Sequence, residues 1–223
     1  STLTLSGANT YSGGTTVSAG TLAGNTTSLQ GNITNNAIVD FNQTTSGTYA
    51  GTMSGSGTLV KEGAGTLTLS GANTYSGDTN INAGTVILTG STGVGVVVPA
   101  NTNIASGATL NGNGTINGNV INSGNVAPSF NGTLTNLTIH GNYTGSAGTY
   151  TSNVYSPATN PSADMITVSG NVTGSTGVTI VNKGGLGNRT TDNGIQVVAV
   201  NGTSTSNAFT LNQRVASGAF EYK

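Results

Sequence analysis

The feature of this 223-residue chain that most limits its possible folds is a long internal repeat. The segment TLTLSGANTYSGGTTVSAGT at 2–21 returns as TLTLSGANTYSGDTNINAGT at 66–85, with 16 of 20 positions identical at an offset of 64. Each copy opens with strictly alternating Leu and Thr, which is typical of a half-buried β-strand. Turn-forming Ser-Gly-Ala-Asn and Tyr-Ser-Gly follow, because glycine reaches positive φ and Asn and Ser bond their own backbone. The repeat therefore predicts short strands joined by tight turns.

These short strands predict a coiled sheet. An offset of 64 accommodates roughly three turns of about 20 residues, a repeat length found in solenoids. The run from Gly112 to Val126 adds one apolar pair or triplet about every six residues, separated by Gly and Asn. We expect an all-β, right-handed, single-stranded parallel β-helix with a C-terminal β cap, its hand following from the preference for right-handed crossovers. Nine or ten turns at ~4.8 Å each would give a rod of ~45 Å.

Composition excludes several other classes. Gly, Ser, Thr and Asn fill 128 positions, and Gly alone fills 36, so an ordinary packed helical domain is ruled out. Disorder is disfavoured by 4 prolines and 5% charged residues. A net charge of −1 gives no electrostatic reason to expect nucleic acid as a partner. The absence of cysteine removes thiolate metal sites, and the longest apolar stretch, 94–98, is too short for a membrane-spanning helix.

The chain changes character after Ser129. Seven of the 11 aromatic residues lie from Phe130 onward, and seven of the 11 charged residues lie from Asp164 onward. The strand-like runs at 164–168 and 194–200 are more apolar than those upstream, while the segment 156–162, with its two prolines, is typical of an exposed loop. Because larger side chains bury more area each, we expect this end to be the more stable one and to cap the coil.

Two segments resemble parts of known bacterial proteins. The segment 57–77, GTLVKEGAGTLTLSGANTYSG, resembles the passenger-associated transport repeat of bacterial autotransporters, the type V secretion proteins. The segment 137–223 resembles their pertactin-like autochaperone region in the motifs at 164–170, 177–182, 194–198, 208–211 and 218–222. The resemblance implies a β-helix stalk over 1–136 and an autochaperone-like cap over 137–223.

The resemblance also carries expectations about the ends of the chain. The first repeat copy lacks its upstream half, so we expect the chain to start inside a repeat. Ser1 opens directly on a strand pattern without a signal peptide. Neither the outer-membrane barrel of the family nor an N-terminal effector region is expected within this sequence.

The function that the resemblance implies is structural. We expect a passenger segment of a surface-displayed autotransporter, an adhesin or an aggregation and virulence factor, exported through the periplasm and outer membrane to the cell surface. Its C-terminal region would nucleate folding and support secretion. The implied partners are its own outer-membrane β-barrel translocator and a host-cell surface, matrix or second copy.

Two alternatives stay open. The chain is the non-catalytic stalk of a secreted enzyme whose catalytic domain lies upstream, or it is a β-solenoid that binds glycans or ice. The second rests on the pairs Thr2/Thr4 and Thr66/Thr68, which would present regularly spaced hydroxyls on a flat face.

No catalytic, cofactor or metal site is predicted, and we expect the chain not to be an enzyme. A catalytic interpretation of His140, the only histidine, needs a serine and Asp164 to meet it by folding, so a strand-surface histidine is favoured. The segment 184–189 begins like a calcium-binding nonapeptide, but Arg189 occupies the aspartate position. Glu62, beside Lys61, is expected to be a solvated charge in a turn. The scattered carboxylates offer no local pair for acid–base chemistry and comprise Asp40, Glu62, Asp78, Asp164, Asp192 and Glu221.

Overall fold

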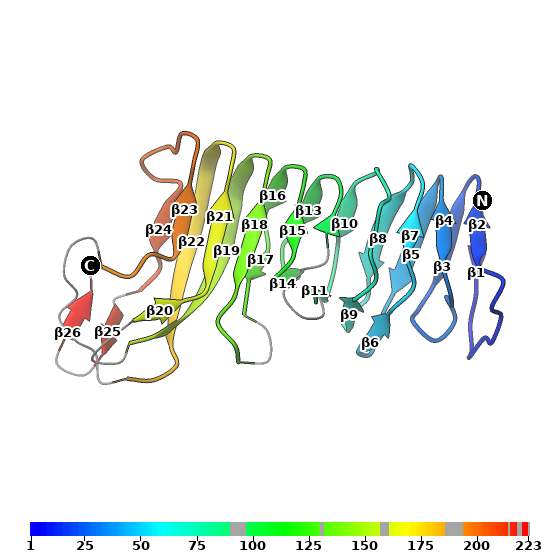
Figure 1. Ribbon diagram of the computed structural model, residues 1–223, viewed down its shortest axis with the longest axis horizontal. Helices are drawn as coiled ribbons and strands as arrows, with labels where there is room; N and C mark the ends of the chain where they lie inside the picture. Colours follow the sequence, from blue (N-terminus) through cyan, green and yellow to red (C-terminus); the bar gives the residue numbers. More distant parts are fainter. Residues whose placement is uncertain are drawn as a thin grey trace.

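The computed structural model is an elongated coil of short strands, with the N-terminus at one end and the C-terminus at the other (Figure 1). It describes residues 1–89, 97–129, 132–156, 161–185, 194–213, 215–217 and 220–222. Almost every strand pair is parallel, and strands that pair come from successive turns of the chain. This arrangement confirms the predicted parallel β-helix.

The strands form three stacks along the coil, which we call the first, second and third faces. The first face contains β1 (Thr2–Thr4), β3 (Thr21–Gly24), β5 (Ile38–Asn42), β8 (Thr58–Glu62), β10 (Thr79–Ile81), β13 (Thr102–Ile104), β16 (Val120–Asn122) and the first parts of β19 (Tyr143–Tyr155) and β22 (Val172–Asn182). An isolated parallel bridge between Val172 and Ser204 extends this face by one level. The described residues thus stack in about the number of turns that the repeat length predicts.

The second face lies beside the first in the same sheet. It contains β6 (Gly47–Tyr49), β9 (Thr66–Leu69), β11 (Thr85–Leu88), β14 (Thr109–Gly112), β17 (Asn125–Ala127), the later parts of β19 and β22, and β24 (Phe209–Leu211). The two long strands β19 and β22 run across the corner between the faces, so they join both stacks.

The third face is made of strands that precede those of the first face in each turn. Its N-terminal sheet is β2 (Thr15–Val17), β4 (Ile33–Asn35) and β7 (Met53–Ser54). Its C-terminal sheet is β12 (Val97–Val98), β15 (Thr115–Ile116), β18 (Asn136–Ile139), β21 (Met165–Val168) and β23 (Val198–Val200). Outside the stacks, β20 (Ser162–Ala163) pairs antiparallel with β19, and β25 (Val215–Ser217) pairs antiparallel with β26 (Phe220–Tyr222).

The core is a continuous column of inward side chains along the coil axis. In the second repeat copy, Leu67 and Leu69 are fully buried while Thr66 and Thr68 are partly exposed, as the alternation predicts. Turns of Leu, Ile and Val stack on one another from Leu22 to Val200, so a low apolar content is enough to fill the narrow interior.

The two repeat copies do not occupy the same face. Thr2 pairs with Thr21, Thr21 with Ile38, and Ile38 with Thr58, so three turns consume 56 residues and not the 64 that separate the copies. Thr66 therefore lies further round the coil, on the second face. The offset therefore spans three turns and part of a fourth, because these three turns are shorter than one third of the offset.

The coil continues without a break past residue 136. Asn136 begins β18, which pairs with β15 before it and with β21 after it. The predicted boundary between a stalk over 1–136 and a cap over 137–223 stays a prediction, since no interruption of the sheets marks it. What changes is strand length, because β19 and β22 turn the corner as single strands. A bulge at the corner of β19 places Ala147 at a φ of 58°.

Large aromatic side chains are not confined to the C-terminal part. Phe41, Tyr49 and Tyr75 are buried in the N-terminal half, and the first two rings lie 5.2 Å apart between centroids. The loop expected at 156–162 lies mostly outside the described residues, as does Phe130.

Candidate functional site

A buried polar network surrounds Asp164, which has no exposed surface. One carboxylate oxygen accepts a hydrogen bond from the backbone N–H of Thr135 at 2.8 Å. The other accepts from the backbone N–H of Asn153 at 3.0 Å and from its side-chain Nδ2 at 2.8 Å. Asp164 precedes β21, whereas Thr135 and Asn153 belong to the turn before it. The carboxylate therefore joins two successive turns, and its charge is balanced by three N–H donors.

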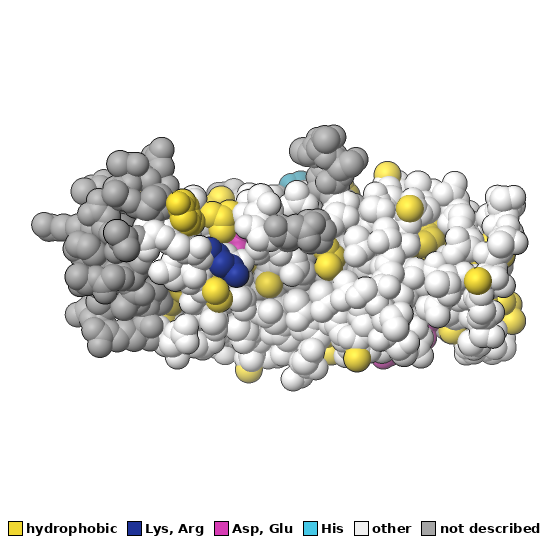
Figure 2. All heavy atoms as spheres, turned by 90° about the horizontal axis from the view of Figure 1, so that it is seen from below, with side chains coloured by type: hydrophobic (Ala, Val, Ile, Leu, Met, Phe, Trp, Pro, Cys, Tyr) yellow, Lys and Arg dark blue, Asp and Glu magenta, His cyan; other side chains and the backbone are white. Residues whose placement is uncertain are grey.

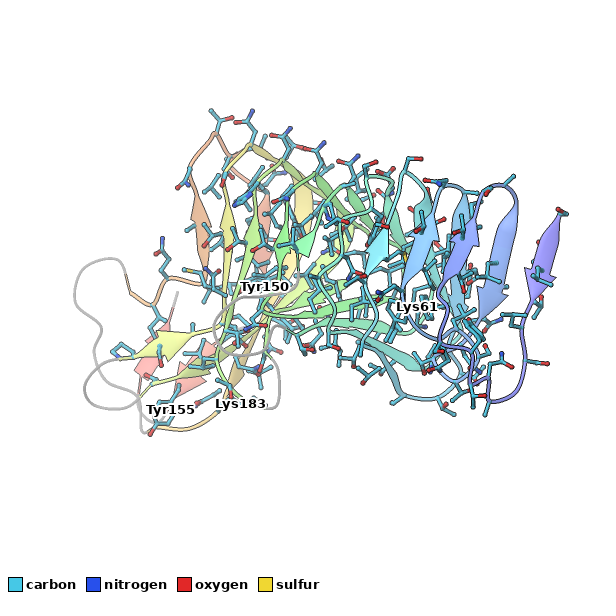
Figure 3. The ribbon with its side chains drawn as sticks, turned by 45° about the vertical axis from the view of Figure 1, so that its right-hand side comes forward. Lys61, Tyr150, Tyr155 and Lys183 are labelled. Atoms are coloured by element: carbon cyan, nitrogen blue, oxygen red, sulfur yellow. The ribbon has the colours of Figure 1, made fainter. Side chains whose placement is uncertain are left out.

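The hydroxyl of Tyr150 joins a third turn to this network. It lies 2.8 Å from the carbonyl oxygen of Asp164 and 2.9 Å from that of Val197, the residue before β23. Ser152 also reaches the Asp164 carbonyl, at 2.9 Å. Burial raises the pKa of Tyr150 well above its usual range, so this hydroxyl stays protonated and acts as a donor. Tyr150 lies inside the coil where β19 and β22 begin to project from it (Figure 3).

A second buried chain of polar groups links the turns of β16, β19 and β22. Asn122 donates from Nδ2 to the hydroxyl of Tyr143 at 2.8 Å and to the carbonyl of Thr149 at 3.0 Å. The Tyr143 hydroxyl lies 3.1 Å from Oγ1 of Thr176 in the next turn. Burial raises the pKa of Tyr143 as well. These side chains link β16, β19 and β22 through the interior.

Aromatic rings close the C-terminal end of this region. Phe209 on β24 stacks on Tyr143, with 5.5 Å between ring centroids, and meets Tyr150 edge-on at 6.4 Å. Both geometries are favourable for aromatic pairs. The two tyrosines that carry the polar networks are thus covered by one ring from the last described turn of the coil.

The expectation that Glu62 lies in a turn beside Lys61 is wrong, because Glu62 is the last residue of β8. Both residues lie in β8, and the alternation of that strand points Lys61 into the coil, where it is fully buried (Figure 3). Its ammonium donates to the carbonyl oxygens of Glu62, Gly63 and Ala83 at 2.7, 2.6 and 3.1 Å. Burial lowers the pKa of Lys61, and the negative charges of Glu62 and Asp40 oppose that shift.

His140 lies on the surface, directly after β18, where its Nδ1 is 3.0 Å from Oδ1 of Asn117 in the preceding turn. Asp164 is buried and bonded to Thr135 and Asn153, so the fold does not join it to His140. The structure thus places His140 at the surface, as its sequence context favours, but directly after the strand and not within it.

The remaining carboxylates are dispersed along the coil. Glu62 accepts from Asn82 at 2.7 Å, and Asp78 accepts from Asn101 at 3.0 Å. Asp40 has a buried Oδ1 without a hydrogen-bond partner, and its pKa is raised by burial and then by Glu62. Within the described ranges, no three His, Asp or Glu side chains are grouped as a metal site would require. Asp192 and the part of the nonapeptide-like segment from Leu186 to Arg189 lie outside those ranges.

The two threonine pairs do not share a surface. Thr2 and Thr4 belong to the first face, next to Thr21 and Ala23, whereas Thr66 and Thr68 belong to the second. Among the described strands of the second face, one column continues as threonine over three turns, at Thr66, Thr85 and Thr109.

Sequence reasoning missed a column of asparagines at the corner that leads into the first face. Asn101, Asn119, Asn142 and Asn171 each use Oδ1 to accept a hydrogen bond from the backbone N–H of the corresponding residue one turn later, at 2.8 to 2.9 Å. A signal was present, because Gly-Asn followed by an apolar residue occurs at 118–120, 141–143 and 170–172. The variable spacing of these tripeptides hid it.

The visible surface is mostly uncharged. In the view of Figure 2 isolated apolar side chains are scattered among polar ones, with a single group of cationic atoms near the C-terminal end. Within the part of the chain that is described, no helix is long and apolar enough to cross a membrane.

Comparisons with known proteins agree with this architecture. The family model described as Autochaperone Domain Type 1 matches residues 111–223, half of the chain. The model of the passenger-associated transport repeat matches residues 1–23 and 59–88. A curated relative, the "Adhesin BmaC autotransporter" of Brucella suis biovar 1 (strain 1330), is 48% identical over 82 residues, which cover 35% of this chain and 2% of that protein. The chain thus spans a very small part of the length of this relative.

Proposed function

Because the chain belongs to the type 1 autochaperone family and is a passenger segment of a surface autotransporter, we propose that Leu137–Lys223 is its folding nucleus and cap. In this proposal residues 1–136 form a stalk that folds onto the nucleus. The observation that carries the proposal is the Tyr150 hydroxyl, which lies within hydrogen-bonding distance of carbonyl oxygens in the two turns that follow its own.

The networks of this region suit a nucleus because they link turns that are distant in sequence. Forming a first turn of a solenoid fixes many residues for few contacts, whereas later turns add to an existing edge. The Asp164 carboxylate and the Phe209 ring add contacts between turns that strand pairing alone does not supply. The contacts between these three turns can therefore offset the loss of conformational entropy on folding of the turns, before any stalk is present.

The order of folding follows from the direction of export that the family implies. A passenger leaves the outer membrane C-terminus first, into a space without ATP, so its first segment must fold alone. A stable C-terminal edge then provides the backbone groups on which each emerging turn pairs.

Refolding of the full chain tests this order. Pulse-labelled hydrogen exchange should show amides of β19, β22 and β24 protected before those of β5 and β8. The variant Phe209→Ala should slow refolding, whereas Leu59→Ala, in the stalk core, should mainly speed unfolding. Earlier protection of β5 and β8, or equal effects of the two variants on refolding, would contradict the nucleus.

The stalk can be tested by itself as a second measurement. Residues 1–136 alone should refold slowly or aggregate, because their exposed edges lack a template. If this fragment refolds as well as the full chain, the nucleus role is wrong.

We also propose that the segment acts outside the cell, as part of a non-catalytic adhesin. Autotransporter passengers are exposed at the cell surface or secreted, and the relative from Brucella is named an adhesin. Its partners in this proposal are its own barrel translocator during export, and afterwards a host surface, matrix or second copy. Repeated weak polar contacts along a rod suit multivalent adhesion. Beads coated with the chain should aggregate or bind cells. If they do neither, adhesion does not reside in this segment of the passenger.

A further inference from the structure

The hydrogen bonds of the asparagine column at the corner before the first face all run in one direction along the chain. We define this corner column as Asn101, Asn119, Asn142 and Asn171, with Thr203 as its last member. In each contact the side-chain Oδ1 comes from the more N-terminal turn and the backbone N–H comes from the next turn toward the C-terminus. Four contacts in succession have this direction.

The turns that the column joins differ greatly in length. Successive members are separated by 18, 23, 29 and 32 residues. Chain length therefore cannot bring each strand to its partner in register. Register is also weakly specified wherever strands are short and rich in Gly and Asn. A local contact that recurs at the start of each strand can specify it.

The residues next to the column members favour a single strand register. Gly118, Gly141, Gly170 and Gly202 precede members of the column, and at each a Cβ would overlap backbone atoms of the turn before. Four column members are followed directly by a fully buried residue, and these residues are Thr102, Val120, Tyr143 and Val172. A slip by one residue would place a side chain against the neighbouring backbone and an asparagine in the core.

We propose that the corner column sets strand register as the coil grows from its C-terminal end. This proposal rests on the folding order proposed above. In that order the turn already folded holds its corner N–H rigidly in place and unpaired, and the arriving turn delivers a mobile Asn side chain to it. One side chain thus aligns each new strand before the rest of its ladder forms.

Engineered cysteines measure register directly, because the chain has no cysteine of its own. Thr144 and Thr173 are Cα partners on adjacent strands, so Thr144→Cys with Thr173→Cys reports the native register. Ser175 pairs with Ser146, so Thr144→Cys with Ser175→Cys reports a slip of two residues. The full chain is refolded with an oxidant, and the yield of each cross-link is measured.

Removing the acceptor of Asn142 should allow the slip. Asn142→Ala should raise the yield of the slipped cross-link by about fivefold, the effect expected for one lost hydrogen bond. Asn142→Asp keeps the acceptor oxygen and should retain the native pattern. Asn136→Ala, on the same turn, removes only the acceptor for the Thr167 hydroxyl and should also leave the pattern unchanged. A wild-type pattern in Asn142→Ala would overturn the register role.

A second position keeps the test decisive if Asn142→Ala does not fold. Asn119→Ala should produce the same slip one turn earlier, reported by Ile121→Cys with Ser146→Cys, whereas Ile121→Cys with Thr144→Cys reports native pairing. An unchanged pattern there would equally overturn the proposal.

The proposal that each Asn side chain arrives from the N-terminal turn is tested by the order in which backbone amides become protected from hydrogen exchange during refolding. Asn119→Ala should delay protection of β16 and of the strands N-terminal to it about fivefold, and leave β19, β22 and β24 unaffected. Asn101→Ala should delay only β13 and the strands before it. Delayed amide protection on the C-terminal side of the substituted residue would overturn the proposed direction of growth. Early protection of the N-terminal turns would overturn both the folding nucleus and this direction. An unchanged cross-link pattern would overturn the register role alone.

Discussion

The ring of Phe209 stacks on the ring of Tyr143 with 5.5 Å between centroids and 26° between planes, although the two residues belong to different turns of the coil. Phe209 thereby covers the tyrosine whose hydroxyl connects Asn122 to Thr176. The last described turn is fixed to the interior by this ring as well as by strand pairing, which is how a terminal turn stabilises a solenoid.

We expect Phe209→Ala to lower the free energy of unfolding by about 2–4 kcal/mol, since it removes a partly buried ring from two aromatic contacts. Urea denaturation gives the value. Leu211→Ala, on the same strand but 49% exposed, is the matched control and should change stability by less than about 0.5 kcal/mol. Similar losses for both variants would mean that the ring has no special role.

Asp164→Ala should cost about 3 kcal/mol or more. The change leaves the N–H of Thr135 and two N–H groups of Asn153 without acceptors in a site that water does not reach. Glu62→Gln keeps its acceptor for Asn82 near the surface and should stay within about 0.5 kcal/mol of wild type. The comparison is made by equilibrium unfolding at neutral pH, and a loss at Asp164 no larger than that at Glu62 would refute the network's importance.

Asp40→Asn should stabilise the protein at neutral pH. The folded state raises the pKa of Asp40, so it favours the protonated carboxyl, and the stability this contributes is lost as pH rises through the folded pKa. The amide removes the charge and preserves the shape. The gain should vanish below the ordinary pKa of 3.8, where both side chains are neutral. Unfolding curves at pH 3 and pH 7 measure this, and an equal difference at both values would show that charge is not the cause.

Stability should fall as pH rises above about 10. Burial raises the pKa of Tyr75 to about 12 and also raises those of Tyr49, Tyr143 and Tyr150. Between the unfolded and folded values only the unfolded chain loses these protons, so stability decreases through that window. Lys61, whose pKa is lowered, gives the opposite slope but is a single group. Tyr75→Phe should make the decline shallower in denaturant titrations, and a slope equal to that of wild type would argue against the role of Tyr75.

Ala147→Gly should stabilise the coil by about 0.5–1 kcal/mol. Ala147 is the one non-glycine residue with positive φ among the described residues, at 58°, and this conformation costs more for alanine than glycine loses in chain entropy. The converse change, Gly7→Ala at a φ of 79° in open space, should destabilise. Thermal unfolding compares the two, and the same sign for both would contradict the backbone explanation.

Local sequence determined the strands and their inward faces. The alternation at 66–69 correctly predicted that Leu67 and Leu69 are buried. The Gly and Asn residues between 112 and 126 correctly predicted the breaks between β15, β16 and β17. These predictions succeed because side-chain alternation and turn chemistry depend on neighbouring residues only. The same reasoning placed His140 on the surface.

Only the tertiary structure decided which turns meet. Lys61 has a charged side chain that its sequence neighbourhood assigns to solvent, yet its ammonium bonds the carbonyl of Ala83 one turn later. Asp164 depends on N–H groups of Thr135 and Asn153, which the coil brings to it from the preceding turn. The repeat copies at 2–21 and 66–85 fall on different faces because turn lengths vary along the chain. Sequence therefore determines the period-two pattern of each strand, while the contacts between turns join residues that are far apart in the sequence and that only the folded coil brings together.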